Sequence, residues 1–171
     1  VMATSDAITI GESWISEHYF TTDARKESFQ SQVVSRRKQW DEEREIGTTR
    51  TRFSAKRSEI LAILATLQTE DDRLPALYAG IEHMLGFDRP GRVLATHGPV
   101  TRVSSVGITG PAPLVIVHAK AVDSVEDLLA KDTNTLFEPF ELDEKTTLTS
   151  VARTLSTLFT SADHPDFALV L

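Results

Sequence analysis

Up to residue 87, apolar residues recur at helical spacing, which predicts that this half of the chain is helical. Thr21 and Thr22, with Asp23 behind them, offer a cap between the first two helices. Pro75 and Gly86 lie where a helix commonly begins and ends, and they delimit the last one. The predicted helices cover residues 11–20, 24–46, 51–67 and 74–87.

The hydrophobic period changes after residue 90. Three short segments follow that are rich in β-branched or aliphatic residues and are separated by Gly and Pro: RVLATHG (92–98), TRVSSVGITG (101–110) and PLVIVHAK (113–120). They predict a meander of three strands. Leu114 to Val117 are apolar without alternation, so the third strand should be central and covered on both faces.

The last third of the chain predicts two helices and a final strand. DSVEDLLAKD (123–132) has the pattern of a short capped helix, EKTTLTSVARTLSTLFT (144–160) that of a longer one, and FALVL (167–171) that of a strand. We therefore expect an α/β domain over residues 71–171, with a central mixed sheet of about four strands flanked by helices. A helical N-terminal extension over residues 1–70 precedes it. Because the chain ends inside an apolar strand, we expect a piece of a longer protein.

Composition narrows the class of protein. The 171 residues, with 40% hydrophobic and 25% charged residues, suit a globular chain. The absence of cysteine excludes disulfides, thiolate metal sites and thiol nucleophiles, and it fits a reducing compartment, so we expect a cytoplasmic protein. No apolar run approaches the roughly 18 residues that span a bilayer, and the N-terminus lacks a signal-peptide pattern. We expect no membrane partner.

The charge is unevenly distributed. The net charge is -7, yet residues 25–57 hold ten basic and five acidic residues, which leaves this segment at +5 and the remainder at -12. The basic segment could contact nucleic-acid phosphates, and duplex DNA is the expected partner. The alternative is a solvated helix face that nearby acids balance. The candidate DNA-binding residues are Arg36, Arg37, Arg50, Arg52 and Lys56, of which Arg50 and Arg52 share a side if their segment is extended.

The order of helix, three strands, helix and strand, with Lys120 ending the third strand, resembles the PD-(D/E)XK nuclease fold of restriction enzymes. The resemblance implies a restriction-endonuclease-like sheet on which an aspartate and an acidic-x-Lys triplet hold Mg²⁺ near a scissile phosphate. Here the triplet is His118, Ala119 and Lys120. Ser104 and Ser105 stand where the resemblance implies an aspartate, and Glu82 could replace the glutamate that some members carry on the preceding helix.

These substitutions predict a degenerate, inactive site formed by Lys120, His118 and Glu82. One glutamate and an imidazole are a poor substitute for two carboxylates, so Mg²⁺ is expected only if the site is active after all, with Glu82 or Asp123 reaching Lys120. We expect no metal ligands otherwise. The simpler interpretation makes Lys120 a strand-end lysine that reaches water, His118 a hydrogen-bonded strand-end residue and Glu82 a solvated helix residue.

A second resemblance involves ISEHYF (15–20), the helix from Phe29 to Trp40 and RTRF (50–53). These segments resemble the opening of bacterial fused restriction-modification proteins (type IIG-like) that carry an adenine-specific DNA methyltransferase, some of them in phage-defence loci. The methyltransferase's Gly-containing loop and Asn-Pro-Pro-aromatic tetrapeptide are absent from this chain, so S-adenosylmethionine would bind only the parent protein.

The two resemblances together imply an N-terminal accessory domain that helps hold DNA or docks the methyltransferase core of the same chain, with cleavage weak or lost. A structural or protein-interaction module without DNA binding is the alternative, favoured by the net charge of -7. An active metal-dependent endonuclease domain comes third.

Overall fold

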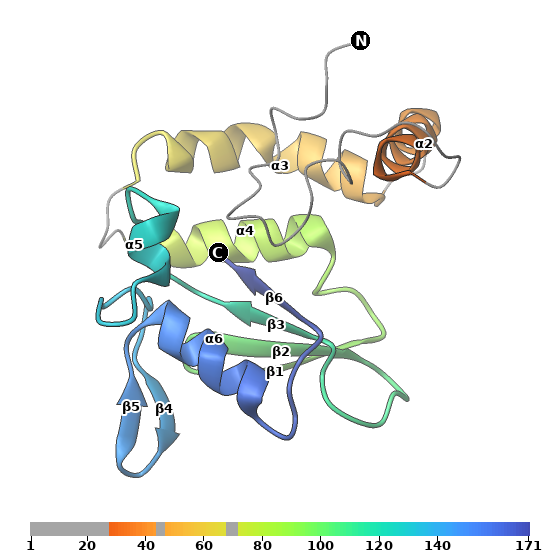
Figure 1. The fold of residues 1–171 in the computed structure, drawn as a ribbon. Coiled ribbons are helices and arrows are strands. Elements are labelled where there is room, and N and C mark those ends of the chain that lie inside the picture. Colours follow the sequence, from red (N-terminus) through yellow and green to blue (C-terminus); the bar gives the residue numbers. More distant parts are fainter. Residues whose placement is uncertain (1–27, 44–46, 68–71) are drawn as a thin grey trace. The chain divides into compact units, whose positions relative to one another are not determined.

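The structure is a computed structural model that describes residues 28–43, 47–67 and 72–171 (Figure 1). The chain forms two compact units, residues 1–51 and 52–171. The helix expected over 11–20 and its cap lie outside the described residues, as does the ISEHYF segment. The expectation that residue 70 ends an N-terminal extension stays a prediction.

The first unit contains the predicted helix α2 (Phe29–Glu42). Ser28 caps it, because its hydroxyl accepts a hydrogen bond from the Ser31 N–H at 3.2 Å and so satisfies one free amide of the first turn. The next helix, α3 (Thr49–Leu64), begins two residues earlier than expected and runs into the second unit. Gly47, at a φ of 90°, makes the turn before it.

The second unit is a mixed α/β domain, as expected. Its four-stranded sheet has the order β1-β2-β3-β6, in which β1, β2 and β3 form the predicted antiparallel meander and β6 lies parallel to β3. A separate hairpin pairs β4 with β5. After α3 the elements are α4 (Leu74–Leu85), β1 (Arg92–His97), β2 (Val100–Ser105), β3 (Leu114–Val117), α5 (Val125–Leu129), β4 (Phe140–Asp143), β5 (Thr146–Leu148), α6 (Val151–Thr160) and β6 (Phe167–Val170).

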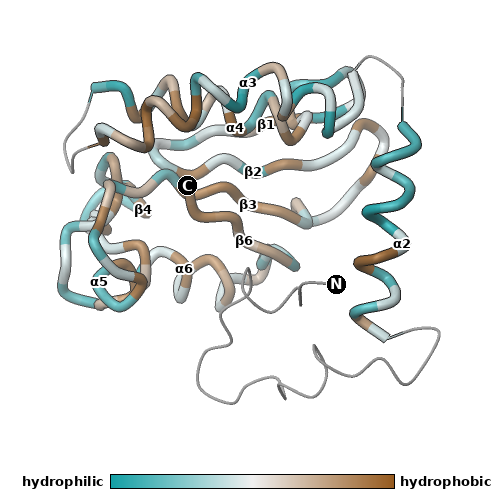
Figure 2. Tube along the Cα trace, turned by 90° about the horizontal axis from the view of Figure 1, so that it is seen from above, coloured by the Kyte–Doolittle hydropathy of each residue, from teal (hydrophilic) through white to brown (hydrophobic). Residues whose placement is uncertain are grey.

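Helices cover β3 on both faces. In Figure 1, α4 lies on one side of the sheet and α6 on the other. Val115 and Val117 belong to a core cluster with Val151 and Leu158 of α6, and Leu77 of α4 belongs to a second cluster that includes residues of α3. Both β3 and β6 are brown, hence hydrophobic, in Figure 2. The central, doubly covered position expected for the third strand is therefore confirmed.

The helix expected over residues 144–160 is wrong at its start. Thr146 to Leu148 form β5, and α6 begins only at Val151. The Asp143 carboxylate accepts a hydrogen bond from the Lys145 N–H at 2.8 Å, a local turn that competes with helix formation. The β-branched threonines that follow suit a strand. The helical spacing of Leu148 with the later leucines was misleading, because Leu148 packs against the core from the hairpin.

Helix α4 ends at Gly86, which has a left-handed φ of 81° and whose N–H donates to the carbonyl of Glu82. The guanidinium of Arg52 also caps this end, since its Nε donates to the Met84 carbonyl at 2.8 Å. A Cβ atom on residue 86 would lie 2.8 Å from a nitrogen of Arg52. Residue 86 therefore favours glycine for its backbone angle, and any larger side chain would also have to displace the end of the Arg52 side chain.

Gly86→Ala should lower the free energy of unfolding by about 2–3 kcal/mol. About 1–2 kcal/mol of this is the cost of placing alanine in a left-handed backbone conformation, and the rest is the cost of displacing the Arg52 side chain from the end of α4. Gly91→Ala is the matched control, because Gly91 has a φ of 89° and a Cβ atom added there would meet nothing within 4 Å. It should lose only the backbone contribution. Chemical denaturation measures the free energy of unfolding of both variants. If the two variants lose the same stability, the Arg52 side chain moves aside without cost.

Candidate functional site

The acid-base residues expected from the sequence meet where β3 ends. The Nε2 atom of His118 lies 2.8 Å from Oε1 of Glu82, and both side chains are about four-fifths buried, with exposures of 20% and 21%. Glu82 comes from the last turn of α4, whereas His118 directly follows β3. Two of the three residues predicted for a degenerate site are thus in direct contact.

Helical spacing positions Glu82 over the strand end. Tyr78 and Glu82 are four residues apart on α4, so they share one face. The ring of Tyr78 stacks on the His118 imidazole, with 4.3 Å between ring centroids and 9° between planes. Stacking and the hydrogen bond to Glu82 together fix the orientation of the imidazole.

Tyr78 also holds the strand end through its hydroxyl. The hydroxyl donates a hydrogen bond to the Ala119 carbonyl, and Phe137 meets the ring edge-on at 5.6 Å between centroids. Burial raises the pKa of Tyr78 well above its usual range, because the phenolate would lose hydration inside the protein. The hydroxyl therefore remains a donor throughout the neutral range.

Backbone hydrogen bonds fix His118 further. Its N–H donates to the Pro99 carbonyl at 2.9 Å, and its carbonyl accepts from the Phe137 N–H at 3.0 Å. Both backbone groups of His118 thus have hydrogen-bond partners, so the imidazole is the polar group of this residue that could take part in chemistry. His118 fits the simpler expectation of a hydrogen-bonded strand-end residue, and its partner is an acid.

Lys120 follows on the same side of the extended chain. Val115, Val117 and Ala119 belong to the core cluster beneath α6, so the alternation of side chains assigns His118 and Lys120 to the α4 side. The Lys120 N–H donates to the Thr135 carbonyl at 2.9 Å, and the residue is half-buried. Glu82, His118 and Lys120 therefore lie on one side of the sheet, at the carboxyl end of β3.

Ser104 and Ser105 do not lie there, contrary to expectation. Val100 pairs with Val117, whereas Ser104 and Ser105 come after Val103, which pairs with Leu114 at the opposite end of β3. Because β2 and β3 are antiparallel, the start of β2 is the part that approaches His118. Ser105 instead accepts a hydrogen bond from Arg92 at 2.7 Å.

The donor set at the end of β3 does not fit Mg²⁺. It offers one carboxylate and one imidazole, and the imidazole engages a carboxylate oxygen. Asp123, the other acid considered, is exposed beside the start of α5. Within residues 28–43, 47–67 and 72–171, no three His, Cys, Asp or Glu side chains gather as metal ligands would. Mg²⁺ prefers near-octahedral oxygen coordination, which this pair does not supply.

Three of the basic residues expected to bind DNA have intramolecular partners. Arg50 pairs with Asp41 at 2.5 Å, Lys56 pairs with Glu59 at 2.8 Å, and Arg52 caps α4. The condition under which Arg50 and Arg52 would share a side, an extended segment, is not met, because both lie in α3, where two residues turn the helix by about 200°. The threonines help to start this helix, because the Thr48 hydroxyl accepts a hydrogen bond from the Thr51 N–H at 3.3 Å.

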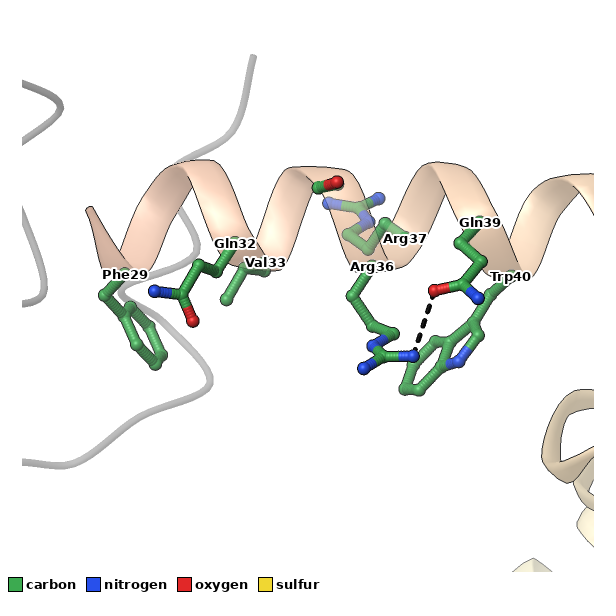
Figure 3. Close-up of a pocket in the computed structure, with 8 residues that line it drawn as sticks. Phe29, Gln32, Val33, Arg36, Arg37, Gln39 and Trp40 are labelled. Carbon is green, nitrogen blue, oxygen red and sulfur yellow. Dashed lines mark hydrogen bonds between the residues drawn. The ribbon is translucent and has the colours of Figure 1, made fainter. Parts of the chain in front are cut away.

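Arg36 and Arg37 line an open hollow of about 490 Å³ along α2 (Figure 3). Phe29, Val33 and Trp40 lie along it, and Arg36 donates to the Gln39 side chain at 2.9 Å. All its described lining residues belong to this single helix, and none is acidic or a histidine. The hollow therefore offers guanidinium and apolar contacts to a partner, without a carboxylate or an imidazole among these residues.

Tyr78 was not predicted as a site residue, because its sequence pattern marked it only as apolar. Its spacing of four from Glu82 is a signal that could have revealed it, because a helix that presents a carboxylate at the sheet presents residue 78 beside it. Phe137 carried no such signal, since it lies in an irregular segment between α5 and β4.

Removing the Glu82 side chain should destabilise the domain. We expect Glu82→Ala to cost about 1–2 kcal/mol, because the partly buried imidazole loses its partner. Glu82→Gln keeps an acceptor oxygen and should cost less. Denaturation of Glu82→Ala, His118→Ala and the double variant measures the coupling, for which we expect about 0.5–1.5 kcal/mol. A coupling of zero would mean that the contact contributes nothing to stability.

Among the residues that the structure describes, no helix has the length and apolar character needed to span a bilayer. No protein-family model, curated protein or solved structure matches the chain significantly.

Proposed function

We propose that this chain is a nuclease-related accessory domain of a bacterial DNA restriction-modification protein that holds duplex DNA without cutting it. The observation that carries the proposal is the 2.8 Å hydrogen bond between Glu82 and His118 beside Lys120. It involves the triplet that the PD-(D/E)XK resemblance places at a cutting site, whereas Ser104 and Ser105, the positions implied for the aspartate, lie at the opposite end of β3. A carboxylate that is bonded to an imidazole is poorly available to a metal ion, whereas a lysine carries the charge that a phosphate attracts.

The order of elements in the second unit supports the nuclease relationship. If α5 and the β4-β5 hairpin are left aside, the elements follow the order helix, three strands, helix and strand on which the resemblance was based. These elements are α4, β1, β2, β3, α6 and β6. The relationship remains a proposal, because topology alone does not define function.

The DNA contacts that we propose come from Lys120 and from the exposed guanidiniums of Arg36 and Arg37. Arg50 and Lys56 are in surface ion pairs that contribute little free energy, so they could exchange their partners for phosphates. Arg52 is the weakest candidate, because it caps α4 and releasing it would expose the Met84 carbonyl.

Fluorescence anisotropy with a labelled duplex tests this function. We expect binding that weakens at least tenfold between about 50 and 200 mM salt, because each phosphate contact releases counterions. Lys120→Ala and the double variant Arg36→Ala/Arg37→Ala should each weaken binding. Lys145→Ala is the control, since Lys145 is an exposed lysine in the β4-β5 turn.

Plasmid incubated with the chain and Mg²⁺ or Mn²⁺ should remain uncut. Metal-dependent cleavage that Lys120→Ala abolishes would overturn the absence of cutting and favour an active endonuclease.

A protein-interaction module that does not bind DNA is the second candidate. It is favoured by the intramolecular partners of Arg50, Arg52 and Lys56 together with the net charge of -7. An absence of duplex binding at about 50 mM salt would reject DNA holding and support this alternative, in which the methyltransferase core of the same protein is the partner to test.

A further inference from the structure

Strand β1 forms an open edge of the main sheet. Among the described strands it pairs only with β2, and all six of its residues are exposed. Val93 and Leu94 are 44% and 42% exposed although they are apolar. Their side chains project to opposite faces, so the strand exposes apolar surface on both faces.

The edge has few of the features by which sheet edges usually avoid pairing, and its charged residue, Arg92, lies at the first position of the strand. Strand β1 contains no proline or lysine, and its six pairs with β2 run from Arg92↔Ser105 to His97↔Val100 without a bulge. A regular, partly apolar edge of this length is a template for another strand. The edge of β1 can therefore accept a further strand.

The outward hydrogen-bonding groups can be assigned from the hairpin. Two residues, Gly98 and Pro99, connect His97 to Val100, so that these form the hydrogen-bonded closing pair. The Val106 N–H donates to the Gly91 carbonyl at 2.9 Å, in keeping with that alternation. The remaining residues of the strand, Arg92, Leu94 and Thr96, therefore face away from β2. Leu94 and Thr96 direct both N–H and C=O outward, whereas the Arg92 N–H donates to the Arg89 carbonyl at 3.1 Å and only its carbonyl faces a partner.

We propose that β1 pairs antiparallel with β1 of a second copy of this chain, about a two-fold axis at Leu94. This register makes Leu94 face Leu94, Arg92 face Thr96 and Val93 face Ala95 of the other copy. Leu94 then exchanges two hydrogen bonds with Leu94 of the other copy, and the Thr96 N–H of each copy donates to the Arg92 carbonyl of the other. The two exposed apolar side chains, Val93 and Leu94, become shared contacts.

The strand's own sequence favours this register over its neighbour. A two-fold axis at Arg92 would place two guanidiniums opposite each other, which is unfavourable. An axis at Leu94 opposes no like charges, and both copies use the same patch, as a closed two-fold dimer requires. The two sheets of four would join into one of eight strands.

Sedimentation equilibrium of the chain from about 1 to 200 µM tests the proposal, with dimers expected as a mass twice the 18.9 kDa of one chain. Because each copy carries a net charge of -7, the dimer should strengthen as salt rises, opposite to the salt response of DNA binding. The opposite salt responses therefore distinguish the two proposals: DNA binding can be absent while the dimer forms, and DNA binding can occur without a dimer.

Leu94→Pro should abolish the dimer, because it removes an N–H that faces outward and leaves the bonds to β2 in place. Its thermal melt should stay cooperative. A second test does not depend on tolerance of proline: Leu94→Cys should give a disulfide-linked dimer on mild oxidation, since opposed Cα atoms of a hydrogen-bonded pair lie about 5.5 Å apart. The chain has no other cysteine to compete.

Val106→Cys is the matched control, because Val106 is a still more exposed valine that lies just beyond β2. It should remain uncrosslinked under the same oxidation. A monomer at every concentration and salt would overturn self-pairing and leave the edge to an extended segment of another protein. Crosslinking of both cysteine variants to the same extent, or a dimer that survives Leu94→Pro, would also overturn it.

Discussion

Replacing Tyr78 by alanine is expected to lower the free energy of unfolding by about 3–5 kcal/mol, the range for truncating a buried aromatic ring. Tyr78 is only 3% exposed. Its ring fills the space between α4 and the end of β3, where it contacts the rings of His118 and Phe137. Alanine would leave a cavity there and remove the stacking surface that orients the imidazole.

Tyr78→Phe separates the hydroxyl from the ring. It keeps the packing and removes the hydrogen bond to the Ala119 carbonyl, so it should cost only about 1–2 kcal/mol. Urea denaturation of both variants gives the comparison. If phenylalanine costs as much as alanine, the hydroxyl and not the ring holds the site together, contrary to our expectation.

Ile116→Ala should lower the free energy of unfolding by about 3–4 kcal/mol, and Ile116→Val by about 1 kcal/mol. The loss of stability increases with the number of methyl and methylene groups removed from a well-packed core. Ile116 is fully buried in the central strand. It pairs with Thr101 of β2 and with Leu169 of β6, so the surroundings have little freedom to collapse into the cavity.

Ile108→Ala provides the control for this series. Ile108 lies in the connection between β2 and β3 and is 62% exposed, so truncating it should change stability by less than about 0.5 kcal/mol. Chemical denaturation of all three variants tests the ranking. A loss at Ile108 equal to that at Ile116 would mean that the connection packs against something in solution.

The fold class was predictable wherever one local pattern dominated. The apolar run of β3 required two covered faces, and Pro75 and Gly86 delimited α4 closely. The hairpin of β4 and β5 was missed because its threonines and Leu148 also fit a helical period, and the turn at Asp143 decided between the two. Such local side-chain competition is not visible in hydrophobic spacing alone.

The candidate site was predictable in its residues and not in its arrangement. Glu82, His118 and Lys120 followed from the resemblance, but their neighbours depend on strand register, which a single sequence does not fix. Strand direction, not register, explains Ser104. It follows the last residue of β2 that pairs with β3, and because the two strands are antiparallel, this end of β2 lies at the start of β3 and not beside His118.

The parallel pairing of β3 with β6 has a consequence for how the protein is made. About fifty residues separate Leu114 from Phe167, its partner in the register. At a synthesis rate of about 5–20 residues per second, a ribosome needs seconds to produce β6 after β3. During that interval β3, a wholly apolar strand, has an unpaired edge where β6 will bind, so chaperone contact during translation should concentrate on the segment from Leu114 to Val117.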